Sequence, residues 1–203
     1  MATFFLVRHA AHDLLSHTLA GRMPGIPLSS AGRMQAEKLA RRLERDGVSA
    51  VGCGPLERAR QTAEPIGRHL GLPVTIEPAL NEIDFGVWNG RRFDELRDDP
   101  LWRRWNLFRS GTRTPGGESM PEVQARMVGL IERLRAEQAD ARCVLVGHGD
   151  AIKAALAHYL GVALDLFQRI EIGPASISVL EVGDYGPRIL SLNETASRMS
   201  GRI

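Results

Sequence analysis

Six short apolar runs recur along the chain, each bounded by glycine, proline or polar residues. Runs of this length and composition are typical of buried β-strands. The strands predicted in this way cover residues 3–7, 48–52, 74–76, 143–146, 177–182 and 188–192.

Two of the stretches between these runs carry apolar residues at helical spacing. The first holds Ala59, Thr62, Ala63, Ile66 and Leu70, and the second holds Val123, Met127, Leu130, Ile131 and Leu134. Ser119 and Glu122 precede the second stretch with the spacing of a capping box, which predicts where that helix begins.

Strands that alternate with helices predict an α/β fold with three layers, in which helices cover both faces of a mostly parallel central sheet. The last two runs are candidates for an antiparallel edge of that sheet. We expect one domain over residues 1–203.

Residues 84–118 interrupt the alternation and are called the cap segment below. The segment mixes aromatic residues with arginines, namely Trp88, Trp102, Trp105, Phe108, Arg91, Arg92, Arg103, Arg104 and Arg109. We interpret it as an inserted cap whose Trp and Arg residues mostly pack the insert and solvate its outer face, with one or two of them expected to meet the substrate.

Composition narrows the class of protein. With 203 residues, 43% hydrophobic and 25% charged, the chain reads as globular, and no apolar run approaches the ~20 residues of a membrane span. The net charge of +2 comes from basic residues spread along the chain, so the charge pattern does not indicate nucleic-acid binding.

The first apolar run lacks a preceding basic region, so we expect no signal peptide and a cytoplasmic protein. Cys53 and Cys143 lie in or beside apolar runs and are expected to be buried, inert thiols.

Two histidines share one local context, because His9 and His148 each follow directly after a predicted strand. Ligands of open α/β sheets gather outside the carboxyl ends of the strands, so both side chains are expected at one crevice. Gly147 and Gly149 leave room beside His148, and a helix that begins near Asp150 offers free amide groups to an anion such as phosphate.

Arginines accompany these histidines. Arg8 precedes His9, and Arg58 falls in the first turn of a helix that Pro55 opens, so both guanidinium groups are expected to reach the same crevice. Arg60 points to another face of that helix and is expected to be solvated.

Eight ordered sequence blocks together resemble the histidine phosphatase superfamily, the phosphoglycerate-mutase-like group. The blocks are Arg8-His9-Ala10, Gly21-Arg22, 27–29, 32–36, 55–63, 80–90, 116–119 and 147–149. The resemblance runs from about Phe4 to about Ala155 and implies the phosphoglycerate-mutase-like fold.

The resemblance also implies roles. His9 would take the phosphoryl group, Arg8, Arg58 and His148 would hold its oxygens, and Glu82 would donate the proton. Arg22 and Gly149 are further candidates for phosphate binding. A neutral imidazole is a competent nucleophile, and a loose phosphoryl transition state chiefly requires positioning and positive charge. Burial favours the acid form of a glutamate, which suits general acid chemistry.

Asp84 lies close to Glu82 in the sequence. It either shares the proton transfer or serves as a turn residue.

The chain departs from the family pattern after the nucleophile, where it has Ala10, Ala11, His12 and Leu15. His12 either replaces a lost phosphate donor or is an exposed loop residue, the commoner outcome. Gly54 stands where relatives often have serine, so that loop is expected to use backbone amides instead.

A zinc site built from His9, His12 and His148 with Asp13 or Glu82 is the sharpest rival. Arg8 and Arg58 would repel a divalent cation, and the resemblance implies neither a metal nor another cofactor. His17, His69 and His158 each stand alone and are given no role.

We therefore predict a metal-independent phosphatase that acts on a small phosphorylated metabolite through a phosphohistidine. The modest length and the block at 85–90 resemble the phosphatase branch more than the mutases. A phosphoglycerate-mutase-type phosphotransferase and a non-catalytic binding protein of the same fold are the alternatives. The sequence does not identify the phosphomonoester, the cap residues that touch it, or the oligomeric state, for which a homodimer stays open.

Overall fold

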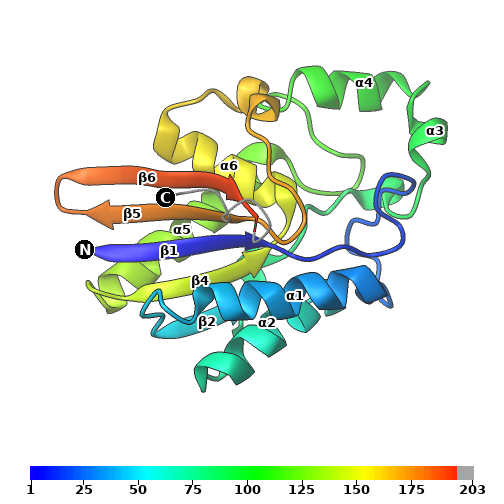
Figure 1. Ribbon diagram of the computed structural model, residues 1–203. Coiled ribbons are helices and arrows are strands. Elements are labelled where there is room, and N and C mark those ends of the chain that lie inside the picture. Colours follow the sequence, from blue (N-terminus) through cyan, green and yellow to red (C-terminus); the bar gives the residue numbers. More distant parts are fainter. Residues whose placement is uncertain (196–203) are drawn as a thin grey trace.

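The computed structural model describes residues 1–195, which form a mixed sheet of six strands with helices on both faces (Figure 1). The strands are β1 (Ala2–Arg8), β2 (Ala50–Cys53), β3 (Val74–Ile76), β4 (Arg142–Gly147), β5 (Ile177–Gly183) and β6 (Gly186–Glu194). Their order is β3-β2-β4-β1-β5-β6. Strands β1 to β4 are parallel to one another, β5 is antiparallel to β1, and β6 is antiparallel to β5. All six predicted strands and the antiparallel edge are confirmed.

Side chains of the central strands point alternately into two separate apolar clusters, one on each face of the sheet. Phe4 and Leu6 of β1 face one cluster, whereas Phe5 and Val7 face the other. Both faces are therefore buried, which explains why the strand reads as a continuous apolar run.

Four long helices cover these faces. The α1 (Ser30–Leu43) and α2 (Glu57–Leu70) helices pack together on one face, and α5 (Met120–Glu137) and α6 (Gly149–Leu160) pack on the other (Figure 1). Helix α1 was not predicted from the sequence, although Ala36, Leu39, Ala40 and Leu43 give it an apolar stripe. The predicted capping box is confirmed, with the Ser119 amide donating to Glu122 Oε2 at 2.8 Å.

The cap segment lies beyond the carboxyl ends of the parallel strands (Figure 1). It contains the 3-10 turn η2 (Gly86–Trp88) and the short helices α3 (Phe93–Leu96) and α4 (Pro100–Leu107). Other 3-10 turns are η1 (Pro78–Leu80) and η3 (Leu164–Arg169). Trp88 and Trp105 are buried in the apolar cluster that α5 and α6 share, so the cap is anchored to the body of the fold.

One cap arginine differs from the others in its burial. Arg91, Arg92, Arg103 and Arg104 are exposed as expected. Arg109 is only 3% exposed, because it stacks on the rings of Trp105 and Phe167 and pairs with Asp150. A guanidinium with an ion partner and aromatic neighbours is readily buried.

Replacing Trp105 with alanine should cost about 3–5 kcal/mol of unfolding free energy, the usual loss for a large buried aromatic side chain. Trp105 is fully buried, meets Phe85 edge to face, and supports Arg109. Urea unfolding measures the change. Leu107→Ala is the matched control, because Leu107 is in the same helix but 79% exposed, and it should change stability by no more than about 0.5 kcal/mol. Equal losses in the two variants would contradict the anchoring role of Trp105.

Candidate active site

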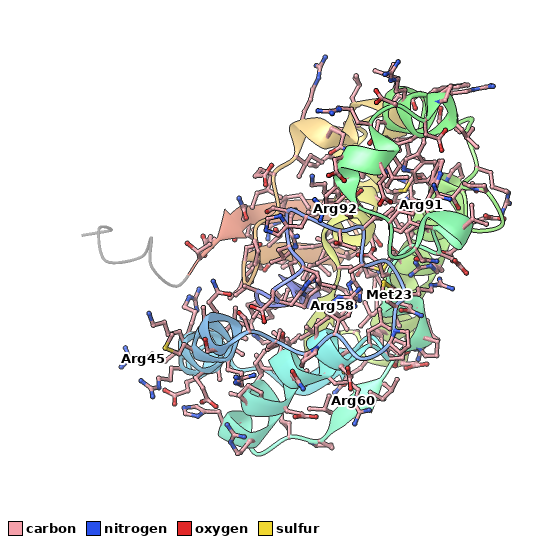
Figure 2. The ribbon with its side chains drawn as sticks, turned by 90° about the vertical axis from the view of Figure 1, so that its right-hand side faces the viewer. Met23, Arg45, Arg58, Arg60, Arg91 and Arg92 are labelled. Atoms are coloured by element: carbon pink, nitrogen blue, oxygen red, sulfur yellow. The ribbon has the colours of Figure 1, made fainter. Side chains whose placement is uncertain are left out.

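The carboxyl ends of β1 and β4 bring the two predicted histidines together. Arg8 and Gly147 are register partners in the parallel pair, so the next residue of each strand, His9 or His148, emerges at the same edge. The two ring centroids are 5.0 Å apart. A cavity of about 490 Å³ opens here, and Figure 2 looks onto this end of the molecule, with Arg58 near its centre.

The His9 ring is held in one tautomer. Its Nδ1 lies 2.8 Å from the carbonyl oxygen of Ala10, and since that oxygen only accepts, Nδ1 carries the proton. The lone pair is then on Nε2. Burial and the nearby Arg58 guanidinium hold the pKa of His9 well below its ordinary value, so the ring is neutral near pH 7.

His148 is fully buried beside His9, and its Nδ1 is 3.4 Å from Glu82 Oε2. Burial also lowers the pKa of His148, with a further contribution from His9. Neither ring nitrogen has a hydrogen-bond partner within residues 1–195, and the fully buried ring lies behind His9 without lining the cavity itself.

Arg8 and Arg58 supply fixed positive charge. Arg8 Nη1 donates to the carbonyl of Ile172, and Arg58 Nη2 donates to that of Gly21, both at 2.6 Å. Arg58 is 1% exposed, yet its Nε and Nη1 have no partner among the described residues. A buried guanidinium with unused donors is suited to an anion. Arg60, by contrast, is exposed as predicted (Figure 2).

Gly149 lets Arg8 lie against the first turn of α6. A Cβ at this position would stand 3.2 Å from Arg8 Nε, tighter than ordinary contacts. Arg8 and the amino end of α6 thus border the same part of the cavity, as expected for an anion site.

Glu82 lines the cavity with a carboxyl group that is largely but not fully buried. Burial raises the pKa of Glu82, an effect that Arg58 and a hydrogen bond from the Ile83 amide partly oppose. The acid form is therefore favoured relative to an exposed glutamate.

The structure does not bring Arg22 to the cavity. Its guanidinium donates to the Glu82 carbonyl at 2.8 Å and pairs with Glu118 at 2.9 Å and Asp84 at 3.4 Å. Arg126 binds the same carbonyl and the same Glu118. Arg22 was predicted to bind phosphate, but these contacts make it a support for the backbone of Glu82.

Asp84 follows the simpler of its two interpretations. Its carboxylate accepts from the amide of Gly86 at 2.9 Å and from Asn89 at 3.4 Å, and it does not line the cavity. It is a turn residue.

His12 corrects the expectation of an exposed loop residue. It is 6% exposed, lines the cavity, and has its ring centroid 5.3 Å from that of His9. Burial, Arg58 and Arg8 lower the pKa of His12 to about 4. Its burial follows from the way the loop is pinned, because the Ala10 amide donates to Thr62 and the Ala11 amide donates to Gln35.

Gly54 does not supply one of the backbone amides expected at the site. Its amide donates to the Val146 carbonyl rather than facing the cavity. In this structure a Cβ on residue 54 would stand 2.7 Å from the carbonyl oxygen of Leu80, so a side chain here would require one of the two segments to shift.

His12→Asn should weaken the loss of thermal stability at acid pH. The pKa of His12 is lower in the folded state than the ordinary value of 6.5, so the unfolded chain binds more protons between about pH 6.5 and 4. Stability is therefore lost as the pH falls through this range. The Tm of the variant, measured from pH 7.5 to 4.5, should fall less steeply than that of the wild type. The exposed His17, changed to asparagine, is the control, and an unaltered slope for His12→Asn would refute the assignment.

Sequence reasoning missed several residues of the cavity. The cap segment contributes Phe93, Trp102, Asn106 and Arg109, and Lys153 and Gln168 come from α6 and η3. Only Lys153 had a usable signal, because it lies one helical turn after Gly149. The cap residues have no periodic pattern that links them to the sheet edge.

No group of three or more His, Cys, Asp or Glu side chains within residues 1–195 is arranged to hold a metal ion. Cys53 and Cys143 are free and buried, as predicted. Among the same residues, no helix is both long enough and apolar enough to cross a membrane.

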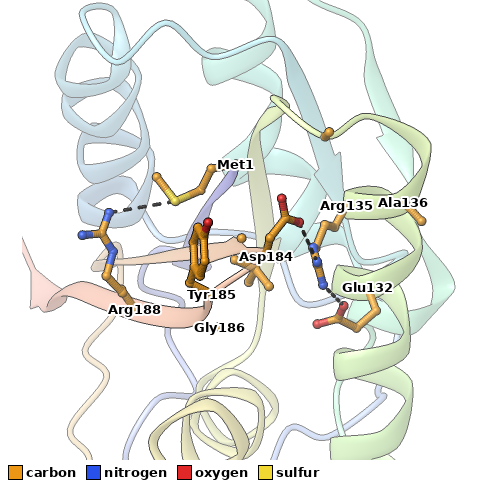
Figure 3. A pocket seen from close by; sticks show the side chains of 11 residues that line it. Met1, Glu132, Arg135, Ala136, Asp184, Tyr185, Gly186 and Arg188 are labelled. Atoms are coloured by element: carbon orange, nitrogen blue, oxygen red, sulfur yellow. Dashed lines mark hydrogen bonds and ion pairs between the residues drawn. The ribbon is translucent and has the colours of Figure 1, made fainter.

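A larger hollow of about 790 Å³ lies at the opposite end of β1 (Figure 3). Met1, Ala136 and Tyr185 contribute to its wall. Arg135 pairs there with Glu132 and Asp184, and Arg188 pairs with Glu181. Because carboxylates already match these cations and no histidine lines the hollow, it does not offer the chemistry found around His9.

The chain belongs to the histidine phosphatase superfamily (branch 1), whose family model matches residues 4–195. It is 32% identical over 200 residues to phosphoserine phosphatase 1 of Hydrogenobacter thermophilus, covering 96% of this chain and 93% of that protein. It is 31% identical over 180 residues to a probable phosphoglycerate mutase GpmB of Photorhabdus laumondii, covering 88% and 84%. Its fold resembles that of a mycobacterial glucosyl-3-phosphoglycerate phosphatase in complex with VO3, with a TM-score of 0.86, 27% identity, and coverage of 95% and 99%.

Proposed function

We propose that the protein is a metal-independent phosphatase that hydrolyses a small phosphomonoester through a phosphohistidine on His9. One observation carries the proposal: the free Nε2 of a neutral His9 borders a cavity that also holds two arginines and a protonation-prone Glu82. The names of the phosphatase relatives support the same chemistry.

In the first step, Nε2 of His9 attacks the phosphorus atom as the bond to the alcohol oxygen breaks. Arg8, Arg58 and His148 hold the phosphoryl oxygens, and the carboxyl group of Glu82 gives its proton to the leaving alkoxide. The imidazolium formed on phosphorylation is stabilised by the Nδ1 hydrogen bond to the Ala10 carbonyl.

In the second step, the Glu82 carboxylate takes a proton from water while the water oxygen attacks phosphorus. The N–P bond breaks, inorganic phosphate leaves, and His9 returns to the neutral ring. No step requires a metal, since arginines provide the positive charge.

Steady release of phosphate from p-nitrophenyl phosphate, equal with and without a chelator, is the expected result. Loss of activity with chelator would contradict metal independence, and no release from a broad set of phosphomonoesters would contradict the function. Because one relative is named a probable phosphoglycerate mutase, isomer exchange is the rival to hydrolysis. Phosphorus NMR of 3-phosphoglycerate should show hydrolysis faster than conversion to the 2-isomer, and the reverse order would favour a mutase.

A further inference from the structure

Beyond the phosphate, we propose that Lys153 binds a carboxylate on the leaving alcohol, which makes the substrate class phosphorylated hydroxy acids. The inference rests on the proposed function, because it assigns the part of the cavity next to the phosphoryl site. The phosphoryl group itself is left to Arg8, Arg58 and the histidines.

The Lys153 ammonium makes no short contact within residues 1–195. Lys153 is 9% exposed and lines the cavity. Its closest oxygens are Gln168 Oε1 at 3.4 Å and Asp150 Oδ1 at 3.9 Å, and the Phe167 ring centroid is 5.8 Å away. Ordinary N–H···O bonds are about 2.7–3.2 Å, so the described residues give this largely buried cation one long hydrogen bond and one long ion pair but no short contact. A carboxylate entering the cavity would supply one.

The cations around Lys153 outnumber the carboxylates. Asp150, the nearest carboxylate, is already paired with Arg109 through Oδ2 at 3.2 Å. Arg109 is in turn fixed by Asn106, whose Oδ1 accepts from Nη2 at 2.8 Å. Two cations and one carboxylate leave this part of the cavity with one positive charge in excess. It is thus complementary to one further negative charge on the ligand.

The distance along α6 from Gly149 to Lys153 fits a short leaving group. Lys153 follows Gly149 by four residues, a rise of about 6 Å along α6. Because Arg8 lies against Gly149, a phosphate held there and a carboxylate held by Lys153 would be separated by a leaving group of roughly three carbons. Trp102 and Phe93 border the same cavity from the cap and offer an apolar wall to that short chain.

Two substrates differ at only the group in question. 3-Phosphoglycerate has a carboxylate where glycerol 3-phosphate has a neutral CH2OH group. The wild type should show kcat/KM roughly 10- to 100-fold higher for the carboxylate, the usual effect of one hydrogen bond to a charged group. Lys153→Met should remove most of that preference, chiefly through KM, and Lys153→Arg should retain it.

Lys38→Met is the matched control, because Lys38 is exposed on α1, and it should keep the wild-type preference. A wild type that prefers glycerol 3-phosphate, or a Lys153→Met variant that keeps the full preference, would overturn the proposal. The first of these results would indicate a neutral polyol as the leaving group.

A binding experiment separates the subsite from the chemistry. Calorimetric titration of both esters into His9→Ala protein, with and without Lys153→Met, requires no turnover. Lys153→Met should weaken the binding of 3-phosphoglycerate at least about tenfold more than the binding of glycerol 3-phosphate. If Lys153→Met weakens the binding of both esters equally, the subsite is overturned. If the wild type hydrolyses neither ester but binding still discriminates between them, the proposed function alone is refuted.

Discussion

His9→Ala should abolish phosphate release, with kcat falling on the order of 10⁴-fold or more, because the covalent route loses its nucleophile. The wild type, mixed rapidly with a labelled phosphomonoester and quenched in alkali, should carry a label that is stable to base and lost in acid, as expected for phosphohistidine. His9→Ala should carry none. Both results follow from the free Nε2 that the Nδ1 bond to Ala10 leaves facing the cavity.

The control for this experiment is His17→Ala, since His17 lies in the same loop but is exposed. It should be labelled and turn over like the wild type. His9→Ala protein that still releases phosphate at a comparable rate would rule out the phosphohistidine route, and a label on another histidine would move the nucleophile.

Glu82→Gln should reduce kcat/KM for an alkyl phosphate by about 10²–10⁴-fold, the range usual for a general acid. The loss should be much smaller for p-nitrophenyl phosphate, because that leaving group departs without a proton. Comparing the two substrates in the two proteins measures the effect.

The pH profile gives an independent readout of the same residue. The pKa of Glu82 is raised by burial, and only the acid form donates, so wild-type kcat/KM should fall as the pH rises through that value. The pKa of His9 is lowered, so the nucleophile stays neutral well below pH 6.5. Glu82→Gln should lack the alkaline fall. Equal losses on both substrates with an unchanged alkaline limb would show that Glu82 only shapes the cavity.

Burial has opposite effects on the two kinds of ionisable group in this site. It favours neutral imidazoles at His9 and His148 and shifts the carboxyl of Glu82 toward its acid form, while arginines remain charged. A neutral nucleophile, a neutral acid and permanent cations can therefore coexist within one cavity. Arginine suits the positions around the phosphoryl group because its guanidinium stays charged when buried and can bond two oxygens at once.

The sequence by itself determined the sheet and the central residues of the candidate site. Strand identity follows from local apolar runs, and parallel strands carry whatever follows them to one edge, so His9 and His148 could be placed together. Arg8 and Arg58 were found from their positions beside His9 and in the first turn of a predicted helix, and Glu82 through the motif blocks. All three lie at the same cavity.

Only the tertiary structure decided the position of His12, the supporting role of Arg22, and the burial of Arg109. Each depends on partners far away in the chain: Thr62 and Gln35 pin the loop before His12, and Asp150 neutralises Arg109. A side chain in an irregular segment has no periodicity that fixes its direction. Its environment is therefore set by packing between distant segments, which a local pattern does not contain.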